Sequence, residues 1–190
     1  MNHGVEHRFP SPRPAAVRLA LGALLALSTS ACSGNNGAAA PPGFEEAARA
    51  FYLGMASEDP AENRTAMAAW VPTQEDLEWL FPGHGALLWK TWGPEATRLI
   101  ADAPAQSESY RSALPYEGVV RTSNLRENGS VILKRSIEFM RPDVPVYGGM
   151  VRTSAGDRVA SSVVKARERW VWIWQLERAG GLISPPDSGA

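Results

Sequence analysis

Cysteine and histidine are scarce in this sequence. Its 190 residues include one cysteine, Cys32, and three histidines. A single thiol cannot form a disulfide within the chain, so packing and hydrogen bonds must stabilise the fold. Zinc sites need closely spaced cysteine and histidine ligands, and His84 is the only histidine downstream of Cys32. The sequence therefore predicts no metal site and no cofactor.

Long hydrophobic runs are also missing. The apolar run near the amino terminus, residues 19–27, has nine residues, which is too short to cross a bilayer core about 30 Å thick. It follows a segment, residues 1–18, that contains three arginines. A basic segment followed by a short apolar run is typical of a secretory signal peptide. We therefore expect residues 1–31 to be a signal peptide.

The residues around the single cysteine, Ser28–Cys32, resemble the lipobox of bacterial lipoproteins. A lipobox has small residues at the two positions before an invariant cysteine, and Ser30 and Ala31 fit this pattern. Thr29 departs from it, because leucine is usual at that position. The resemblance implies cleavage after Ala31, diacylglycerol on the Cys32 thiol and an acylated new amino terminus. Such anchoring is stable, since each buried CH₂ group contributes about 0.8 kcal/mol.

Ser33, rather than an aspartate, follows the cysteine. By the sorting rule known for some Gram-negative bacteria, this implies transport to the outer membrane, where the protein would face the periplasm. The alternative is an ordinary secreted protein that is cut at the same small residues. Cys32 would then be an unpaired thiol in an oxidising compartment, which is a liability, so the sequence favours a lipid anchor in the cell envelope.

Composition divides the rest of the chain into a tether, a folded domain and a tail. Residues 32–43 are rich in glycine, alanine, asparagine and proline and predict a flexible tether. Residues 44–178 have the periodic apolar patterns of a folded domain, and residues 179–190 predict a flexible tail. Periodicity and capping signals predict helices over residues 44–57, 59–71, 73–81, 86–91 and 94–101, followed by a polar connection over 102–109.

The apolar period changes to that of strands in the second half of the domain. Asn128-Gly129 predicts a tight turn, because these residue types accept positive φ, and a hairpin between strands 118–126 and 130–141. Further strands are expected over residues 144–153, 158–166 and 169–177, with a bulge at Gly148-Gly149.

The last of these strands contains three tryptophans. Trp170, Trp172 and Trp174 fall on one face of the strand, and Val171 and Ile173 fall on the other. Because both faces are apolar, the pattern is typical of an interior strand that is covered on both sides.

Helices followed by antiparallel strands predict an α+β fold, in which N-terminal helices pack on a curved antiparallel sheet of about four to six strands. The opening helix 44–57, the capped second helix and the strand pair 159–165 and 169–173 resemble the nuclear transport factor 2-like superfamily. This is the cone-like fold shared by ketosteroid isomerase and SnoaL-like polyketide cyclases. The resemblance covers most of residues 44–178 and implies a cone that is either open as a pocket or filled by side chains.

An enzyme of this superfamily would use an aspartate or histidine in the cone as a general base, with its pKa shifted by burial or by a neighbouring charge. His84 lies in a predicted loop, where we expect it to be solvated, and no aspartate falls inside a predicted strand. Glu117 and Glu138 are the carboxylates associated with predicted strands. No catalytic residue is predicted, and a protein that is not an enzyme is favoured.

Residue alternation identifies side chains that would line a pocket if the cone is open. These are Trp170, Trp172, Trp174, Tyr147 and Arg135. An arginine on an apolar face needs a partner, so Arg135 either binds an anion in the cone or lies at its rim in a salt bridge. The tryptophans either bind an apolar or carbohydrate ligand or form the core together with helix tryptophans such as Trp70. The core is favoured.

Charge is distributed unevenly along the domain. Residues 44–109 hold 4 basic and 11 acidic residues, whereas residues 110–178 hold 12 basic and 7 acidic ones. The basic half either faces anionic lipid or glycan or complements the acidic helices of the same chain. An exported chain that is acidic once residues 1–31 are removed argues against nucleic acid as a partner.

These patterns together favour a membrane-anchored envelope lipoprotein that acts as a non-catalytic binding or assembly module. Its partners would be the membrane, through the lipid anchor, and either another envelope protein or a small hydrophobic ligand. Two alternatives stay open. One is a small isomerase, hydrolase or cyclase-like enzyme that works in the cone, and the other is a carrier of a hydrophobic ligand.

Overall fold

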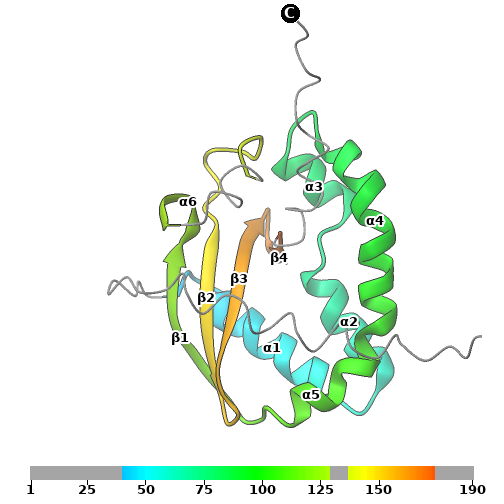
Figure 1. Ribbon diagram of the computed structural model, residues 1–190, viewed down its shortest axis with the longest axis vertical. Coiled ribbons are helices and arrows are strands. Elements are labelled where there is room, and N and C mark those ends of the chain that lie inside the picture. The colour runs from blue at the N-terminus through cyan, green and yellow to red at the C-terminus, as the bar shows by residue number, and fades with distance from the viewer. Residues whose placement is uncertain (1–39, 129–136, 174–190) are drawn as a thin grey trace, which may run out of the picture.

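The computed structural model describes residues 40–128 and 137–173. Helices come first and antiparallel strands follow, which confirms the predicted α+β class (Figure 1). The helices are α1 (Phe44–Ala56), α2 (Pro60–Trp70), α3 (Gln74–Leu80), α4 (Gly85–Asp102), the 3₁₀ helix η1 (Ala103–Gln106), α5 (Ser107–Arg111) and α6 (Leu125–Asn128). The strands are β1 (Tyr116–Asn124), β2 (Tyr147–Thr153), β3 (Gly156–Ala166) and β4 (Arg169–Trp172).

Several predictions concern residues outside the described ranges. These are the signal peptide, the lipid attachment site Cys32, the pocket residues Arg135 and Trp174, and the tail over residues 179–190.

Among the helices in the described ranges, none combines the length and the apolarity that a membrane-spanning helix requires.

The starts of α2 and α3 have the caps that the sequence predicts. The Asp59 side chain accepts a hydrogen bond from the Ala61 amide at 2.8 Å, and Pro60 occupies the first helical position. Thr73 and Asp76 form a reciprocal capping box, in which each side chain accepts a hydrogen bond from the other residue's amide. Both helix starts are therefore fixed by local chemistry.

A single helix replaces the two short helices expected over residues 86–91 and 94–101. α4 runs without a break through Pro94. A proline usually disfavours helical backbone in the preceding residue, because its ring clashes with the Cβ atom of that residue. The preceding residue is Gly93, which has no Cβ and is buried. The polar connection expected over residues 102–109 is also wrong, since η1 and α5 occupy it.

The four described strands form one antiparallel sheet in the order β1-β2-β3-β4. The register of the β2–β3 pair shifts between Tyr147 and Gly149, which confirms the bulge predicted at the two glycines. The β1–β2 pair contains two further shifts. Bulges of this kind increase the local twist and bend the bulged strand, so they account for the curvature of the sheet.

The hairpin predicted across Asn128-Gly129 is wrong where the structure describes it. The residues before this turn form α6 rather than the end of a strand, and residues 137–140 form a turn rather than part of the predicted strand 130–141. The Arg126 guanidinium, within α6, donates to the Val144 carbonyl at 2.6 Å. This hydrogen bond ties α6 to a distant part of the chain.

Helices and sheet enclose one hydrophobic core. α1 crosses the sheet, while α2, α3 and α4 lie on the side of β4 (Figure 1). Buried side chains from both layers meet between them, and the largest include Phe44, Met55, Trp70, Leu77, Leu80, Phe81, Leu88, Val163 and Val171. The core is therefore built from α1, α2, α3 and α4 together with the closing strand pair.

β4 confirms part of the prediction for the tryptophan strand. Trp170 is buried on one face, and Val171 and Ile173 are buried on the other, so both faces are covered as expected. The interior position is not observed, because within the described residues β3 is the only strand that pairs with β4. Helix α2 lies beside β4 instead, and the Arg169 side chain donates hydrogen bonds to its carboxyl end.

Candidate functional site

Nine aromatic side chains form a continuous network between α1, α2, α5 and the sheet. Their ring centroids are separated by 4.9 to 6.0 Å, mostly in edge-to-face geometry. We call this set the aromatic cluster, and its members are Phe44, Phe51, Tyr52, Trp70, Tyr110, Tyr116, Tyr147, Trp170 and Trp172. The cluster lies in the hydrophobic core or packs against it, between the helices and the sheet.

Three of the predicted pocket residues belong to this cluster. Trp170 is 6% exposed and contacts Phe44 and Tyr147, with ring centroids at 5.1 and 5.8 Å. Trp172 is partly buried and contacts Phe51 at 4.9 Å and Trp70 at 5.4 Å. The structure thus brings Trp170, Trp172 and Tyr147 together as packed neighbours.

The phenol of Tyr116 lies at the edge of the cluster, near the first turns of α1. Burial raises the pKa of this phenol, and the neighbouring Glu45 carboxylate raises it further. Glu45 also accepts a hydrogen bond from the Val119 amide at 2.7 Å, while the Arg49 guanidinium lies 5.1 Å from the Tyr116 ring centroid. The Tyr116 ring therefore packs where the first turns of α1 meet β1.

His84 is less solvated than the sequence suggests. It precedes α4 directly and is partly buried, with its ring centroid 4.8 Å from that of Phe139. Its Nδ1 lies 3.3 Å from the Pro82 carbonyl oxygen. The ring therefore packs against the turn that contains Phe139.

The carboxylates of the strands lie at the surface. Asp157 is in β3, contrary to the expectation that no aspartate lies inside a strand, and it is exposed and paired with Arg152 at 2.9 Å. Glu117 and Glu138 are exposed. In residues 40–128 and 137–173, no group of three or more histidines, cysteines and carboxylates could hold a metal ion.

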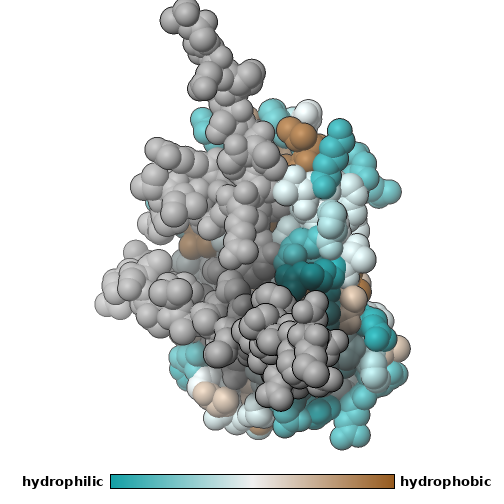
Figure 2. Space-filling view, turned by 45° about the vertical axis from the view of Figure 1, so that its right-hand side comes forward, coloured by the Kyte–Doolittle hydropathy of each residue, from teal (hydrophilic) through white to brown (hydrophobic). Residues whose placement is uncertain are grey.

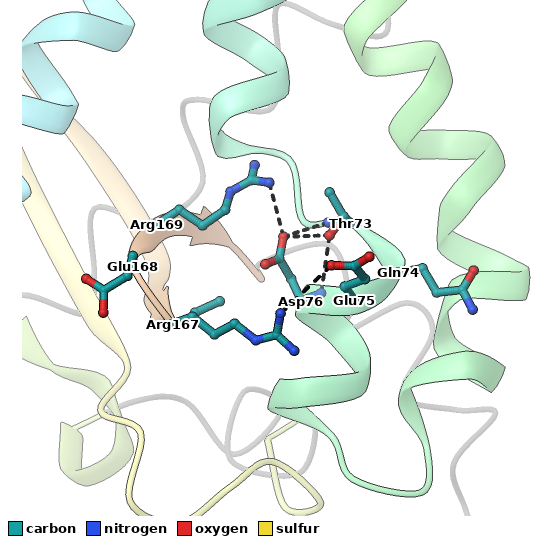
Figure 3. A pocket seen from close by; sticks show the side chains of 8 residues that line it. Thr73, Gln74, Glu75, Asp76, Arg167, Glu168 and Arg169 are labelled. Carbon is teal, nitrogen blue, oxygen red and sulfur yellow. Dashed lines mark hydrogen bonds and ion pairs between the residues drawn. The ribbon is translucent and has the colours of Figure 1, made fainter.

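Asp76 and Arg169 form an ion pair that the sequence analysis missed. The Asp76 side chain is 7% exposed, and its Oδ2 lies 3.4 Å from Nη1 of Arg169 (Figure 3). The same oxygen accepts hydrogen bonds from the amide and hydroxyl of Thr73 at 2.9 and 3.0 Å. Asp76 thus serves at once as a helix cap and as the counterion of a strand residue.

Arg169 also binds the last turn of α2. Its Nη2 donates to the carbonyl oxygens of Ala68, Ala69 and Val71 at 2.8, 3.0 and 3.1 Å. The last carbonyls of a helix have no partner within it, and they carry partial negative charge. α2 has no basic residue in its own last turn. One guanidinium therefore joins the end of α2, the start of α3 and β4.

Two open hollows flank the turn between β3 and β4. The first, which we call the polar hollow, has a volume of about 650 Å³ and lies between the start of α3 and this turn (Figure 3). It is lined by Thr73, Gln74, Glu75, Asp76, Ala166, Arg167, Glu168 and Arg169. Its charges are paired, since Arg167 lies 3.8 Å from Glu75, and Glu168 lies 3.7 Å from Lys165.

The second hollow, which we call the apolar groove, runs between α1 and α2 and has a volume of about 700 Å³. It is lined by Gly43, Glu46, Ala47, Ala50, Phe51, Gly54, Glu62, Thr65, Ala66, Ala69, Trp70, Lys165, Glu168, Arg169 and Trp170. Buried aromatic rings of the cluster lie beneath it, and six of its lining residues are glycine or alanine. Glu168 and Arg169 line both hollows.

No family model, curated protein or solved structure matches this chain. What its surface can bind must therefore be inferred from its own residues.

On the face drawn in Figure 2, the visible apolar side chains of the described residues do not gather into one large patch. The face in Figure 2 is mostly hydrophilic or neutral where the described residues are visible, and its apolar atoms form small separate patches. The large hydrophobic side chains that are exposed, Leu53, Leu87 and Val120, lie on α1, α4 and β1.

The sequence contained two signals for this site. The residues Thr73 to Asp76 predicted the start of a helix, and the acidic first half and basic second half allowed charge complementarity within the chain as one of two interpretations. The ion pairs Asp76–Arg169 and Glu75–Arg167 realise that complementarity. Neither signal identifies which arginine meets which carboxylate.

Proposed function

We propose that this chain is a lipid-anchored protein of the bacterial cell envelope, and that its folded part is a non-catalytic binding module of the nuclear transport factor 2-like type. The observation that supports this proposal is the aromatic cluster, which occupies the space between the helices and the sheet. An enzyme or carrier of that type holds its ligand inside the cone. A filled cone leaves the outer surface for binding.

The charged groups around the β3–β4 turn are consistent with this role. A general base must be free to take a proton from a substrate. Asp76 is instead engaged by Thr73 and Arg169, and the exposed acids of the polar hollow are paired with neighbouring cations. Paired charges of this kind fix the shape of the surface and leave hydrogen-bonding groups at the rim of the polar hollow.

The tether supports a partner near the membrane. Residues 32–43 span at most about 40 Å when fully extended, which limits the distance between the proposed lipid and the domain. Ala40 packs against the core, and Gly43 lines the apolar groove. The groove therefore opens where the tether joins the domain, and another envelope protein is the partner that this placement favours.

Replacing Cys32 with serine is expected to release the protein from the membrane, because serine oxygen does not accept the thioether-linked diacylglycerol of a lipoprotein. Fractionation of cells into soluble and membrane fractions measures this, and most of the protein should move to the soluble fraction. The matched control is Ser33→Asp, which retains the cysteine and should stay with membranes. Unchanged partitioning of the Cys32→Ser variant would refute the lipid anchor.

Binding can be tested by photo-crosslinking from Glu168, which lines both hollows and is almost fully exposed. A photo-reactive phenylalanine derivative at this position should give a discrete protein adduct in cells that produce the anchored protein. The same derivative at Ala101, an exposed residue of α4, is the control and should give none. If Glu168 gives no adduct, or if both positions give the same ones, the chain has no specific partner on this face.

A further inference from the structure

We propose that the apolar groove binds an amphipathic α-helix of a partner protein, and that this helix has lysine or arginine residues at two positions separated by seven or eight residues. The inference rests on the proposed function as a binding module and specifies its partner. Three properties of the groove support it, namely the size of its wall residues, the placement of its acids and the engagement of its cations.

The walls of the groove leave room for a third helix. α1 contributes Ala47, Ala50 and Gly54, and α2 contributes Ala66 and Ala69. Small side chains on two neighbouring helices let the backbone of a third helix approach to the usual interaxial distance of about 8–10 Å. Many proteins bind an amphipathic helix by laying its apolar face into a groove that is apolar at its base.

Packing between α1 and α2 explains only part of this pattern. A Cβ atom on Gly54 would lie 2.7 Å from the Cβ of Ala66, so these two residues are small because the helices touch there. Ala50 and Ala69 are exposed on the groove walls. Their small size is not required by the contact between α1 and α2, and it keeps the groove open.

Two acids give the groove an unbalanced negative charge. Glu46 in α1 and Glu62 in α2 are exposed, and within residues 40–128 and 137–173 neither of them forms an ion pair. The cations that line the groove are already engaged, since Lys165 lies 3.7 Å from Glu168 and Arg169 is bound to Asp76 and to α2 carbonyls. A cationic partner would therefore meet two uncompensated carboxylates.

The positions of these acids set the spacing expected in the partner. Glu62 lies beside Gly54, because a Cβ on Gly54 would be 3.7 Å from the Glu62 carbonyl oxygen. Glu46 and Gly54 are eight residues apart on α1, which corresponds to about 12 Å along the helix axis. A bound helix that lies along the groove would place two basic residues over the two carboxylates if they are separated by seven or eight positions.

Selection from a displayed library of random 20-residue peptides tests this inference. The target is the lipidated protein in detergent micelles, and peptides that also bind the Ala50→Trp variant are removed. Enriched peptides should be amphipathic, with lysine or arginine at the stated spacing. Their affinity should fall at least ~10-fold for Ala50→Trp, and ~3–10-fold for Glu46→Gln or Glu62→Gln at low salt.

Two controls keep the result specific to the groove. Glu75→Gln removes an acid from the polar hollow and should leave the affinity unchanged. Ala69→Trp fills the groove from the other wall and should repeat the effect of Ala50→Trp, and thermal unfolding curves establish that both variants are folded.

Enrichment of peptides without the basic pair, or binding that both tryptophan variants retain, would overturn the groove assignment. Absence of any enriched peptide would overturn it as well. The wider proposal of a binding module is judged separately by the Glu168 crosslinks. If these adducts form and persist in the Ala50→Trp and Ala69→Trp proteins, the partner binds elsewhere on this face.

Discussion

Replacing Arg169 with methionine is expected to lower the free energy of unfolding by about 2–4 kcal/mol. The substitution leaves the buried Asp76 carboxylate without its counterion and leaves the last carbonyls of α2 without their donor. Removal of one partner from a buried ion pair costs more than the pair contributes, because the remaining charge is desolvated and unpaired. The Arg169 side chain is 36% exposed, so water reaches the site in part and moderates the loss. Urea unfolding of the purified protein, followed by circular dichroism, measures the change.

The matched control is Arg167→Met, two residues away on the same turn. Arg167 pairs with Glu75 at 3.8 Å, and both side chains are exposed, so its loss should cost no more than about 0.5 kcal/mol. If Arg169→Met costs as little as Arg167→Met, then Arg169 does not join α2, α3 and β4 as the geometry indicates.

A double-mutant cycle with Asp76→Asn separates the two roles of Arg169. Asparagine keeps a cap for α3 but removes the negative charge. If the ion pair couples the two residues, the double variant should be more stable than the sum of the two single effects predicts. Purely additive effects would mean that the bonds of Arg169 to α2 account for its whole contribution.

The helical half of the fold was predictable because its signals are local. Asp59 and Pro60 mark the start of α2, and Thr73 and Asp76 mark the start of α3. The two residues of each pair lie within four positions of each other. Such caps depend on side chains that reach backbone atoms of their own turn. The tryptophan strand was predictable for a similar reason, since alternation along one short segment decides which face is buried.

The errors in the second half arise where distant residues decide the local structure. Asn128-Gly129 favours a tight turn between strands, yet the described residues up to Asn128 form α6, in which Arg126 bonds to the carbonyl of Val144. The error at Pro94 lies in the helical half and has a local cause: Pro94 suggests a break between two helices, but Gly93 before it lacks the Cβ that would clash with the proline ring. In both cases the hydrophobic periodicity of the segment does not take the deciding residue into account.

The candidate site could be predicted from the sequence only in part. The uneven charge of the two halves was compatible with basic strands that meet acidic helices, and the Arg169–Asp76 pair is one such contact. The apolar groove had no comparable signal. Small residues such as Ala50 and Ala69 are common in any helix, and they acquire meaning only when α1 and α2 are placed side by side.

Replacing Trp172 with alanine is expected to destabilise the protein by about 3–5 kcal/mol. The indole contacts the rings of Phe51 and Trp70 at 4.9 and 5.4 Å, so its removal would leave a cavity between α1, α2 and the sheet. Trp172→Phe keeps a ring at this position and should cost about 1 kcal/mol. Urea unfolding of both variants gives the comparison.

The size of this loss also decides between a filled and an open cone. A tryptophan that lines a ligand pocket already faces solvent or ligand, so its truncation removes few contacts and costs far less than the loss of a packed ring. A cost below about 1 kcal/mol for Trp172→Ala would mean that the ring lines a pocket. The aromatic cluster would then no longer favour a surface-binding module over an enzyme or carrier. A cost in the expected range, together with unchanged Glu168 crosslinks in the folded Trp172→Phe protein, would place recognition outside the cone.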